Sequence, residues 1–508
     1  MQRGLPLFLF WKCWFTCSAF VLHKTSRHVV LRSTRDNFPA DCDAYKRIVL
    51  VGGGHAHLQV IKAFNEKVRH QDWQVTLIDK NEKVSYSGMV PGCISGQYTK
   101  EETQISLSDL SSWADIKFHV DQVIDIDLDR QKILLENKKE WIEYDVLSLD
   151  IGSTSRGLKD VKGVTDFAIP TRPIDVLVDK IDAAANKLET SLETDCAEVC
   201  VIGGGIAGIE LALAIRQRFK NANPSKEIKV TILDSRDELL PQESSACREA
   251  LKDILSERDI EILHNTRVSC IEEHEIKLQD GRCISYTHCI WATGAEAHAL
   301  AYRLKSRGLS ISKDGWIITG PTLQSVSHKN IFAAGDCAMI QGLIDSEGKS
   351  KASPPKAGVY AVRAGPVLVK NIACMLNYKN LTKYEPQDEF LRLINCADGK
   401  ALGFRFGLPL YGKWVYDLKD TIDQMFMNLF RKEHLPDLDS VDSSTLDTTQ
   451  YDQYTTQSTK CTPDEAKQLL LRTDDEVDYQ EAWAILRQMM SDQEYREEII
   501  SESKITIT

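Results

Sequence analysis

The chain contains two separate copies of a strand–glycine-loop–helix pattern, and this repetition constrains the fold more than any other feature. The first copy reads KRIVLVGGGHAHLQVIKAF from residue 46, and the second reads VCVIGGGIAGIE from residue 199. In each copy an apolar run ends in three glycines and passes directly into a helical pattern. Such a turn leaves backbone N–H groups at a helix N-terminus free to bind a pyrophosphate. The sequence therefore predicts two dinucleotide-binding units.

The first unit departs from the usual glycine spacing. It contains Gly52, Gly53 and Gly54, and His57 stands where a third glycine belongs. That glycine permits close packing of helix on strand, so its replacement weakens the match. The next apolar strand ends in Asp79, which lies 27 residues after Gly52, where an acid that binds a ribose hydroxyl is expected.

The second unit carries all three glycines in register, at Gly203, Gly205 and Gly208. Its second strand ends in Asp234, an acid that hydrogen-bonds the 2′-hydroxyl of NAD and repels the 2′-phosphate of NADP. Arg236 follows two residues later and would favour NADP instead. We expect NADH to be preferred, with NADPH as the open alternative.

Three further strand segments follow in a fixed order. DVLSLDIGS contains Gly152 and precedes the second unit, CIWATGA contains Gly294 and follows it, and NIFAAGDCA then supplies Gly335 and Asp336. A nicotinamide dehydrogenase needs one dinucleotide unit, whereas a flavoenzyme reduced by NAD(P)H needs two. The order resembles that of two-dinucleotide-binding-domain flavoproteins, in which the NAD domain is inserted in the FAD domain. This resemblance implies an α/β fold of two Rossmann-like domains nested in that way, plus a small C-terminal α+β region and an acidic helical tail.

Composition changes along the chain complete the predicted organisation. Residues from Asp437 onward hold 17 acidic and 6 basic residues, which accounts for −11 of the net charge of −12. This acidity describes an appendage, and it disfavours a nucleic-acid binder. The predicted regions are a targeting presequence (1–44), the first segment of the FAD-binding domain (45–160), a connecting segment (161–195), an NAD(P)H-binding domain (196–297), the second segment of the FAD-binding domain (298–380), a C-terminal acceptor-side region (381–435), a linker (436–461) and an acidic helical tail (462–508).

Over residues 46–431 these motifs resemble the pyridine nucleotide-disulfide oxidoreductase superfamily. Within it the chain is most similar to type II NADH dehydrogenases and to the flavoprotein module found beside selenide water dikinase. The segments that carry the likeness are VLVGGGHAH, SYSGMVPGCISG, LDIGST, WATGA, SPPKAGVYAVRAGP and WVYDLKDTIDQMFM. The resemblance implies an enzyme that passes hydride from NAD(P)H to FAD and then two electrons to a quinone or other small acceptor. Its alternative is a flavoprotein of selenium or sulfur metabolism, sulfide:quinone or selenide-linked.

The resemblance also assigns residues to the cofactors, and it implies no metal site. Gly203, Gly205, Gly208 and Asp234 would bind NAD(P)H, with Glu210 approaching the nicotinamide as a catalytic residue. The FAD residues would be Gly52, Gly53, Gly54, Asp79, Gly152 and Asp336, with Asp336 on the ribitol. His55, Lys80, Gly294 and Gly335, which neighbour these motifs, are further candidate cofactor-binding residues.

A second catalytic candidate lies where the sequence departs from the type II dehydrogenase pattern. Type II dehydrogenases place a helix with two glutamines beside the flavin, and the matching stretch PKAGVYAVR has neither. Pro354 and Pro355 predict that this helix starts there. Lys356 would then lie in the first turn, where the ammonium and the helix dipole both stabilise an anionic reduced flavin.

The cysteines argue against a redox disulfide. Disulfide reductases of the superfamily carry two cysteines in the helix after the first glycine loop, and that helix has none here. Cys93 stands alone, and Cys337 is expected to be a small buried residue. Electrons must then leave the flavin directly, so sulfide oxidation is the weaker alternative.

The segments after the core raise three further expectations. Residues 412–434 combine an apolar stripe at i, i+4, i+8 spacing with flanking basic residues, among them Lys419. This helix suits either peripheral membrane contact, where quinone enters, or packing in a homodimer or against another domain. The tail from residue 462 is predicted to form two short helices and to bind a protein partner.

The N-terminus has the composition of a targeting segment. Residues 1–35 contain six basic residues and no acid. The apolar run up to Phe20 resembles a signal-peptide h-region, and the basic stretch after it resembles a transit peptide. The combination is similar to the bipartite plastid presequences of algae and predicts a plastid protein, thylakoid- or envelope-associated. A mitochondrial presequence is the alternative.

Overall fold

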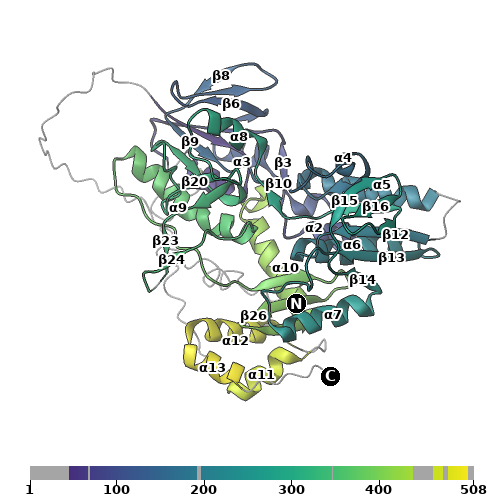
Figure 1. The fold of residues 1–508 in the computed structure, drawn as a ribbon. Coiled ribbons are helices and arrows are strands. Elements are labelled where there is room, and N and C mark those ends of the chain that lie inside the picture. Colours follow the sequence, from purple (N-terminus) through teal and green to yellow (C-terminus); the bar gives the residue numbers. More distant parts are fainter. Residues whose placement is uncertain are drawn as a thin grey trace, which may run out of the picture.

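The computed structural model describes residues 45–66, 69–190, 196–345, 347–438, 462–472, 477 and 479–501 (Figure 1). The predicted presequence (1–44) and most of the predicted linker (439–461) lie outside the described residues. The described residues form two α/β units, a three-stranded antiparallel sheet with a long helix, and a group of C-terminal helices.

The first glycine loop belongs to a five-stranded parallel sheet in the order β21-β9-β1-β2-β5. All four residues of β9 and the last four of β1 are buried, as expected for a parallel sheet covered on both faces. The strands are β1 (Lys46–Val51), β2 (Trp73–Asp79), β5 (Lys117–Val120), β9 (Val146–Leu149) and β21 (Ile331–Ala333).

The second glycine loop belongs to a sheet with the same arrangement, in the order β11-β18-β12-β13-β14. In each unit a three-stranded antiparallel sheet lies in the sequence just before the strand that flanks the loop strand: β6–β8 before β9, and β15–β17 before β18. The strands are β11 (Ile169–Pro170), β12 (Cys196–Ile202), β13 (Glu227–Leu233), β14 (Ile260–Leu263), β18 (His288–Trp291), β6 (Val123–Asp127), β7 (Lys132–Leu135), β8 (Trp141–Glu143), β15 (Val268–Glu272), β16 (Glu275–Leu278) and β17 (Cys283–Ser285).

The second unit is inserted into the first, since β11 to β18 follow β9 in the sequence and precede β21. The chain crosses between the units at β10 (Thr154–Ser155) and β19 (Ala295–Glu296), which pair antiparallel. The predicted fold class is therefore confirmed. Three short strand pairs complete the sheets: β3 (Lys83–Ser85) with β4 (Gln104–Ser106), β20 (Ile317–Thr319) with β22 (Ala338–Ile340), and β23 (Leu343–Ile344) with β24 (Ser350–Lys351).

Helices pack beside the sheets (Figure 1). Helices α1 and α6 directly follow the two glycine loops in the sequence. The helices of the two units are α1 (His55–Ala63), α2 (Val90–Ser95), α3 (Leu107–Trp113), α4 (Val164–Phe167), α5 (Leu177–Thr190), α6 (Ile206–Ala222), α7 (Ser245–Glu257), α8 (Ala299–Ser306) and α9 (Gly358–Leu376). Among the described helices, α9 is the one long and apolar enough to span a bilayer by length and composition. However, 56% of the apolar 18-residue stretch of this helix is buried inside the fold, as in a core helix.

The contact between α1 and α9 compensates for a proline. Pro366 lies inside α9 and lacks an N–H group, so the Val362 carbonyl loses its helical partner. Gln59 of α1 donates its Nε2–H to this oxygen at 2.6 Å. Gly365 leaves the space for the amide, because any side chain at that position would overlap it.

The predicted appendage is integrated into the C-terminal region. Helices α11 to α13 lie together at one end of the molecule (Figure 1). They share one apolar cluster with α10 and β27, which includes Trp414, Leu418 and Trp483. Three helices form in the tail, where two were predicted, and Thr462 and Glu465 form a capping box at the start of α11. The elements are β25 (Arg392–Asn395), β26 (Ala401–Arg405), β27 (Leu408–Gly412), α10 (Lys413–Asn428), α11 (Pro463–Leu471), α12 (Tyr479–Ser491) and α13 (Gln493–Ser501).

Candidate active site

Both glycine loops open into one cavity, which runs between the two units and reaches the C-terminal sheet and α10. Its volume is about 1580 Å³, larger than the roughly 300–1,000 Å³ of a single small-molecule site. Gly208 does not line it, and Gly335 lines a small adjoining pocket. The other candidate residues all line it: Gly52, Gly53, Gly54, His55, Asp79, Lys80, Gly152, Gly203, Gly205, Glu210, Asp234, Gly294, Asp336 and Lys356.

In the first unit Asp79 fixes the glycine loop from the end of β2. One carboxylate oxygen accepts a hydrogen bond from the Gly53 N–H at 2.7 Å, and the other accepts from Asn81 N–H at 2.8 Å. Gly52 has a φ of +92°, a left-handed conformation that favours glycine. Asp79, the acid at the position expected to bind the ribose, therefore fixes the conformation of the loop that lines the cavity.

His57 fills the place of the missing third glycine. Its Nδ1 lies 2.7 Å from the Gly52 carbonyl oxygen, and its Nε2 lies 2.8 Å from Ser148 Oγ. Because a carbonyl only accepts, the proton is on Nδ1, and Ser148 donates to Nε2. Burial lowers the pKa of His57 to about 4, so the ring is neutral. In the second unit a side chain at Gly208 would overlap the Gly203 carbonyl oxygen.

A buried carboxylate that sequence reasoning missed lies at the N-terminus of α1. Asp150 directly follows β9, is 4% exposed and lines the cavity. Its Oδ2 accepts hydrogen bonds from the N–H groups of Ala56 at 2.9 Å and His57 at 3.2 Å. Burial raises the pKa of Asp150 to about 7, although these two bonds oppose the rise. Asp150 belongs to the segment DVLSLDIGS, of which only the glycine pointed to a cofactor.

Asp336 lies in the short turn η4 (Gly335–Cys337), close to the first glycine loop. Its Oδ2 accepts from Ser153 Oγ at 2.9 Å and forms an ion pair with Arg172 at 3.5 Å. The charge of Asp336 also acts on His55, the first residue of α1, although burial dominates and lowers the pKa of His55 to about 4.

The expected helix start at Pro354 and Pro355 is wrong. Helix α9 begins at Gly358, so Lys356 lies two residues before it rather than in its first turn. Lys356 is anchored elsewhere: its Nζ donates to the Ala338 carbonyl oxygen and lies 4.3 Å from the centroid of the Trp316 ring. Lys356 therefore lies outside the helix. Lys356 still lines the cavity, and burial lowers the pKa of its ammonium group.

In the second unit the ribose acid has a cationic partner. Arg236 Nη2 lies 2.8 Å from Asp234 Oδ2, and Arg236 Nε lies 3.1 Å from both carboxylate oxygens. The same Nη2 donates to the Gly204 carbonyl oxygen at 2.8 Å. Both residues line the cavity. The carboxylate that would select NADH is thus paired with the cation that would accept a 2′-phosphate.

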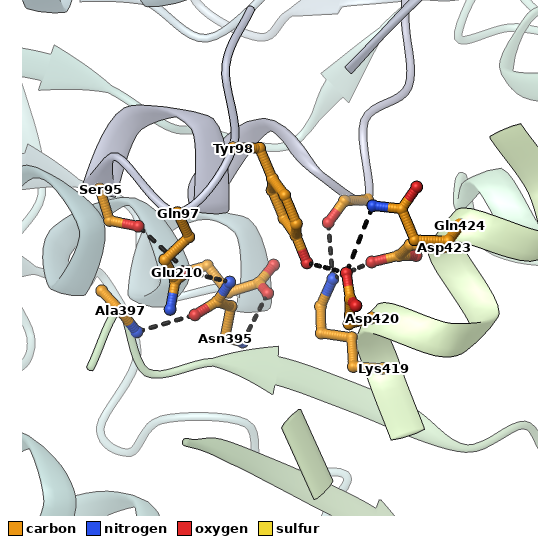
Figure 2. Close-up of polar contacts among 11 residues, drawn as sticks. Ser95, Gln97, Tyr98, Glu210, Asn395, Ala397, Lys419, Asp420, Asp423 and Gln424 are labelled. Atoms are coloured by element: carbon orange, nitrogen blue, oxygen red, sulfur yellow. Dashed lines mark hydrogen bonds and ion pairs between the residues drawn. The ribbon is translucent and has the colours of Figure 1, made fainter. Parts of the chain in front are cut away.

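Glu210 on α6 faces charged residues of α10 and an edge of the C-terminal sheet (Figure 2). Its Oε1 accepts from the Asn395 N–H at 2.9 Å. Lys419 Nζ donates to Asp423 Oδ2 at 2.6 Å and to the Gly88 carbonyl oxygen at 2.7 Å. Burial raises the pKa of Glu210 to about 7, and the charge of Lys419 opposes the rise. Lys419 was expected among the basic residues that flank the apolar stripe, but its side chain is buried and paired with Asp423.

The end of the cavity near α10 is aromatic and apolar. The His55 ring lies 5.4 Å from the rings of both Tyr86 and Phe426, which stack on one another at 4.6 Å. Trp483 of the tail, 4% exposed, also lines the cavity. Sequence reasoning missed Tyr86 and Trp483, because nothing local to either residue signals a site. Other apolar lining residues here are Phe390, Leu391, Leu393, Leu418, Ile422 and Met425.

Cysteine thiols do not line this site among the described residues. All ten cysteines within the described ranges are free thiols. Cys337 is buried and donates its Sγ–H to the Ala334 carbonyl oxygen at 3.2 Å, and Cys93 is buried in α2.

The pyridine nucleotide-disulphide oxidoreductase family matches residues 46–365, and the chain belongs to this family. Its predicted cofactors, FAD and NAD(P)H, are those of such a two-unit flavoprotein, which confirms the cofactor prediction. The residues present fit both groups, because each loop presents a helix N-terminus to the cavity and an acid at the end of the second strand.

Individual proteins are similar over most of the chain. The type II NADH:quinone oxidoreductase of Staphylococcus aureus (strain NCTC 8325 / PS 47) is 24% identical over 394 residues, covering 74% of this chain and 94% of that protein. The structure of NDH2 from Plasmodium falciparum in complex with NADH has a TM-score of 0.62 at 16% identity, covering 77% of this chain and 99% of that one. The sulfide:quinone oxidoreductase from Aquifex aeolicus has a TM-score of 0.61 at 17% identity, covering 78% and 94%.

Proposed function

We propose that the chain is an FAD-dependent NAD(P)H:quinone oxidoreductase in which electrons leave the flavin directly for the acceptor. The observation that carries this proposal is the single cavity that joins both glycine loops to an apolar end, without a cysteine among its described lining residues. The similarity to type II NADH:quinone oxidoreductase supports the same acceptor class.

The two units divide the binding work. When bound, FAD accepts hydride from NAD(P)H and delivers two electrons to the acceptor. The first unit would hold it through the loop at Gly52–Gly54, Asp79 and Asp336. The second unit would orient the nicotinamide nucleotide through its own loop and Asp234. The cavity brings both units within reach of His55 and Glu210.

The expectation that Glu210 approaches the nicotinamide stays a prediction. Because Glu210 lines the cavity and faces α10, we propose that it instead holds a proton near the acceptor. Reduction of a quinone to a quinol takes up two protons as well as two electrons. A carboxyl group whose pKa is about 7 carries a proton in a large fraction of molecules at neutral pH and can release it. Lys419, buried beside Asp423, supplies positive charge that acts on Glu210.

The acceptor end also involves the tail. We propose that α12 completes the acceptor compartment through Trp483, in addition to any protein partner that the tail binds. The apolar stripe on α10 is covered within the chain, since Trp414, Leu418 and Phe426 are buried. Peripheral membrane contact and homodimerisation therefore need other surfaces, and both stay predictions.

We further propose a plastid location, on the basic and acid-free composition of residues 1–35. Fusing residues 1–44 to a fluorescent protein and imaging it in an alga with secondary plastids tests this. Plastid fluorescence is the expected result, and mitochondrial fluorescence would support the alternative.

The function itself is tested with the purified full chain. We expect a yellow protein with one non-covalent FAD, which oxidises NADH only when a short-chain benzoquinone is added, one quinone being reduced per NADH. Omission of quinone and omission of protein are the controls. Oxidation that depends on sulfide or a selenium compound, with quinone inactive as sole acceptor for NADH, would support the selenium or sulfur alternative instead.

A further inference from the structure

Asp150 adds a carboxyl group to the first unit that the second unit lacks at the same place. Asp150 follows β9, and Ala292 follows β18, the strands that flank the two loop strands. A side chain at Gly52 would overlap the Asp150 carbonyl oxygen, and one at Gly203 would lie 2.5 Å from the Ala292 carbonyl oxygen. The backbone is thus alike at both places, and only the carboxyl group differs.

This carboxyl group lies where a phosphate would approach the loop. Its Oδ2 accepts from Ala56 and His57, whose N–H groups belong to the first turn of the nine-residue helix α1. Its Oδ1 points toward Gly335 and has no hydrogen-bond partner among the described residues. A side chain at Gly54, in the loop itself, would overlap the carboxyl group.

The surroundings offer an ionised Asp150 little compensation. The charges that act on it are those of Asp336 and Asp79, both negative, and no ion pair to it forms within the described ranges. The ring of His57 is neutral, and burial keeps His55 neutral as well. Other groups on the packed elements are engaged: Cys337 with Ala334, Arg172 with Asp336, and Lys356 with Ala338.

We propose that Asp150 is a protonated contact of the FAD pyrophosphate, with Oδ2 on the α1 amides and a proton on Oδ1 donated to a phosphate oxygen. This rests on the proposed assignment of FAD to the first unit. An ionised carboxylate only accepts hydrogen bonds and would repel the phosphates, whereas the protonated group donates one. At a pH where Asp150 is ionised in the FAD-free protein, binding of FAD is accompanied by uptake of one proton from solvent.

The resulting pH dependence has a definite sign. Burial sets the pKa of Asp150 at about 7 before FAD binds, and a bound anion raises it further. The affinity for FAD is then constant below this pH and falls above it, by up to about tenfold per pH unit. Asp150→Asn keeps a donor that does not titrate, and Asp150→Ala restores the residue found in the second unit.

The test is FAD release from the full-length holoenzyme, diluted at a series of pH values from about 6 to about 9 and followed by free-flavin fluorescence. The wild type should show the falling affinity. Asp150→Asn should be flat and bind FAD more tightly than the wild type at high pH, and Asp150→Ala should be flat and weaker than Asp150→Asn. A flat wild-type profile, or an unchanged slope in Asp150→Asn, would overturn the proposal.

A second readout does not depend on the variants' affinity. Glu210 contributes a protonated-carboxyl C=O band to both proteins at neutral pH, so the readout is the infrared difference spectrum of wild-type minus Asp150→Asn holoenzyme, which should contain one further C=O band of a buried protonated carboxyl group. An identical spectrum in both proteins would also overturn the proposal. A chain that binds no FAD at any pH would contradict the proposed function itself, so the two failures are distinguishable.

Discussion

The two dinucleotide units have the same sheet order and the same loop geometry, but they differ at three equivalent places. The third glycine is Gly208 in the second unit and His57 in the first. The residue after the flanking strand is Ala292 in one and Asp150 in the other. Two positions beyond the third glycine lie Glu210 and Gln59, which have different tasks.

These differences show that the same backbone arrangement accepts different side chains at the contact between helix and loop. In the second unit the helix packs so close that only glycine fits opposite the Gly203 carbonyl. In the first, an imidazole donates a hydrogen bond to the corresponding Gly52 carbonyl. Gln59 supports the backbone of α9, whereas Glu210 faces the cavity. The first unit thus has more buried polar groups, which makes it the more sensitive to pH and to substitution.

The largest effect on cofactor binding is expected at the second glycine of each motif, Gly54 in the first unit and Gly205 in the second. Gly54→Val would drive a side chain into the Asp150 carboxyl group and into the FAD site, so the protein should be purified without flavin. Gly205 has open space around it, so Gly205→Val should keep FAD and slow its reduction by NADH on the order of 100-fold, by displacing the nicotinamide. Flavin absorbance and stopped-flow reduction measure both. Full flavin occupancy in Gly54→Val would break the comparison.

Variants of the equivalent residues Glu210 and Gln59 should affect different properties, the reaction rate for Glu210 and the stability of the fold for Gln59. Glu210→Gln should reduce the rate of flavin reoxidation by quinone on the order of 100-fold, with flavin reduction by NADH retained. In the wild type this reoxidation should slow as the pH rises through about 7, because Glu210 loses its proton, and the variant should lack that dependence. Gln59→Leu leaves the Val362 carbonyl unpaired and should cost about 1–3 kcal/mol of stability with little kinetic effect. Normal reoxidation in Glu210→Gln would remove its assigned role.

Substitution of His57 tests whether its hydrogen bonds to Gly52 and Ser148 stabilise the first unit. His57→Ala leaves the Gly52 carbonyl and Ser148 without partners and should lower the free energy of unfolding by about 2–4 kcal/mol. The exposed His70→Ala is the matched control and should be neutral. Denaturant unfolding followed by circular dichroism measures the loss, and stability equal to that of the control would contradict it.

The same histidine gives stability a pH dependence. The pKa of His57 is about 4 in the folded chain and 6.5 in the reference state, so the unfolded chain binds more protons between these values. Stability should therefore fall on acidification below about pH 6.5, by about 1.4 kcal/mol per pH unit for this group. His55 contributes in the same direction. His57→Ala should show a shallower slope.

Nucleotide preference gives the smallest effect. Asp234→Ser frees Arg236 for a 2′-phosphate and should shift the ratio of kcat/KM values toward NADPH by about tenfold, or ~1.4 kcal/mol. Arg236→Ala should shift the ratio toward NADH. Unchanged ratios in both variants would show that neither side chain reaches the ribose.

Much of this architecture could be predicted from local patterns. Glycine loops, apolar strands and the acids after them are adjacent in sequence, so both units and their nesting were predictable. The start of α9 was not, because Lys356 is held by Ala338 and Trp316, which lie far from it along the chain. Periodicity likewise placed Lys419 only among the basic residues that flank the apolar stripe, because it does not reveal that another element covers that face of α10. The role of Asp150 depends on where β9 ends relative to α1, which only the folded chain shows.

The central claim is that electrons pass from NAD(P)H through FAD directly to a quinone. It is tested most directly by anaerobic two-step stopped flow: the flavin is reduced with one equivalent of NADH and then mixed with a short-chain benzoquinone. We expect complete reoxidation in a single phase, at least as fast as turnover, in the wild type and equally in Cys93→Ser and Cys337→Ser. A reduced flavin that quinone does not reoxidise, or a cysteine variant that fails in this step, would contradict it.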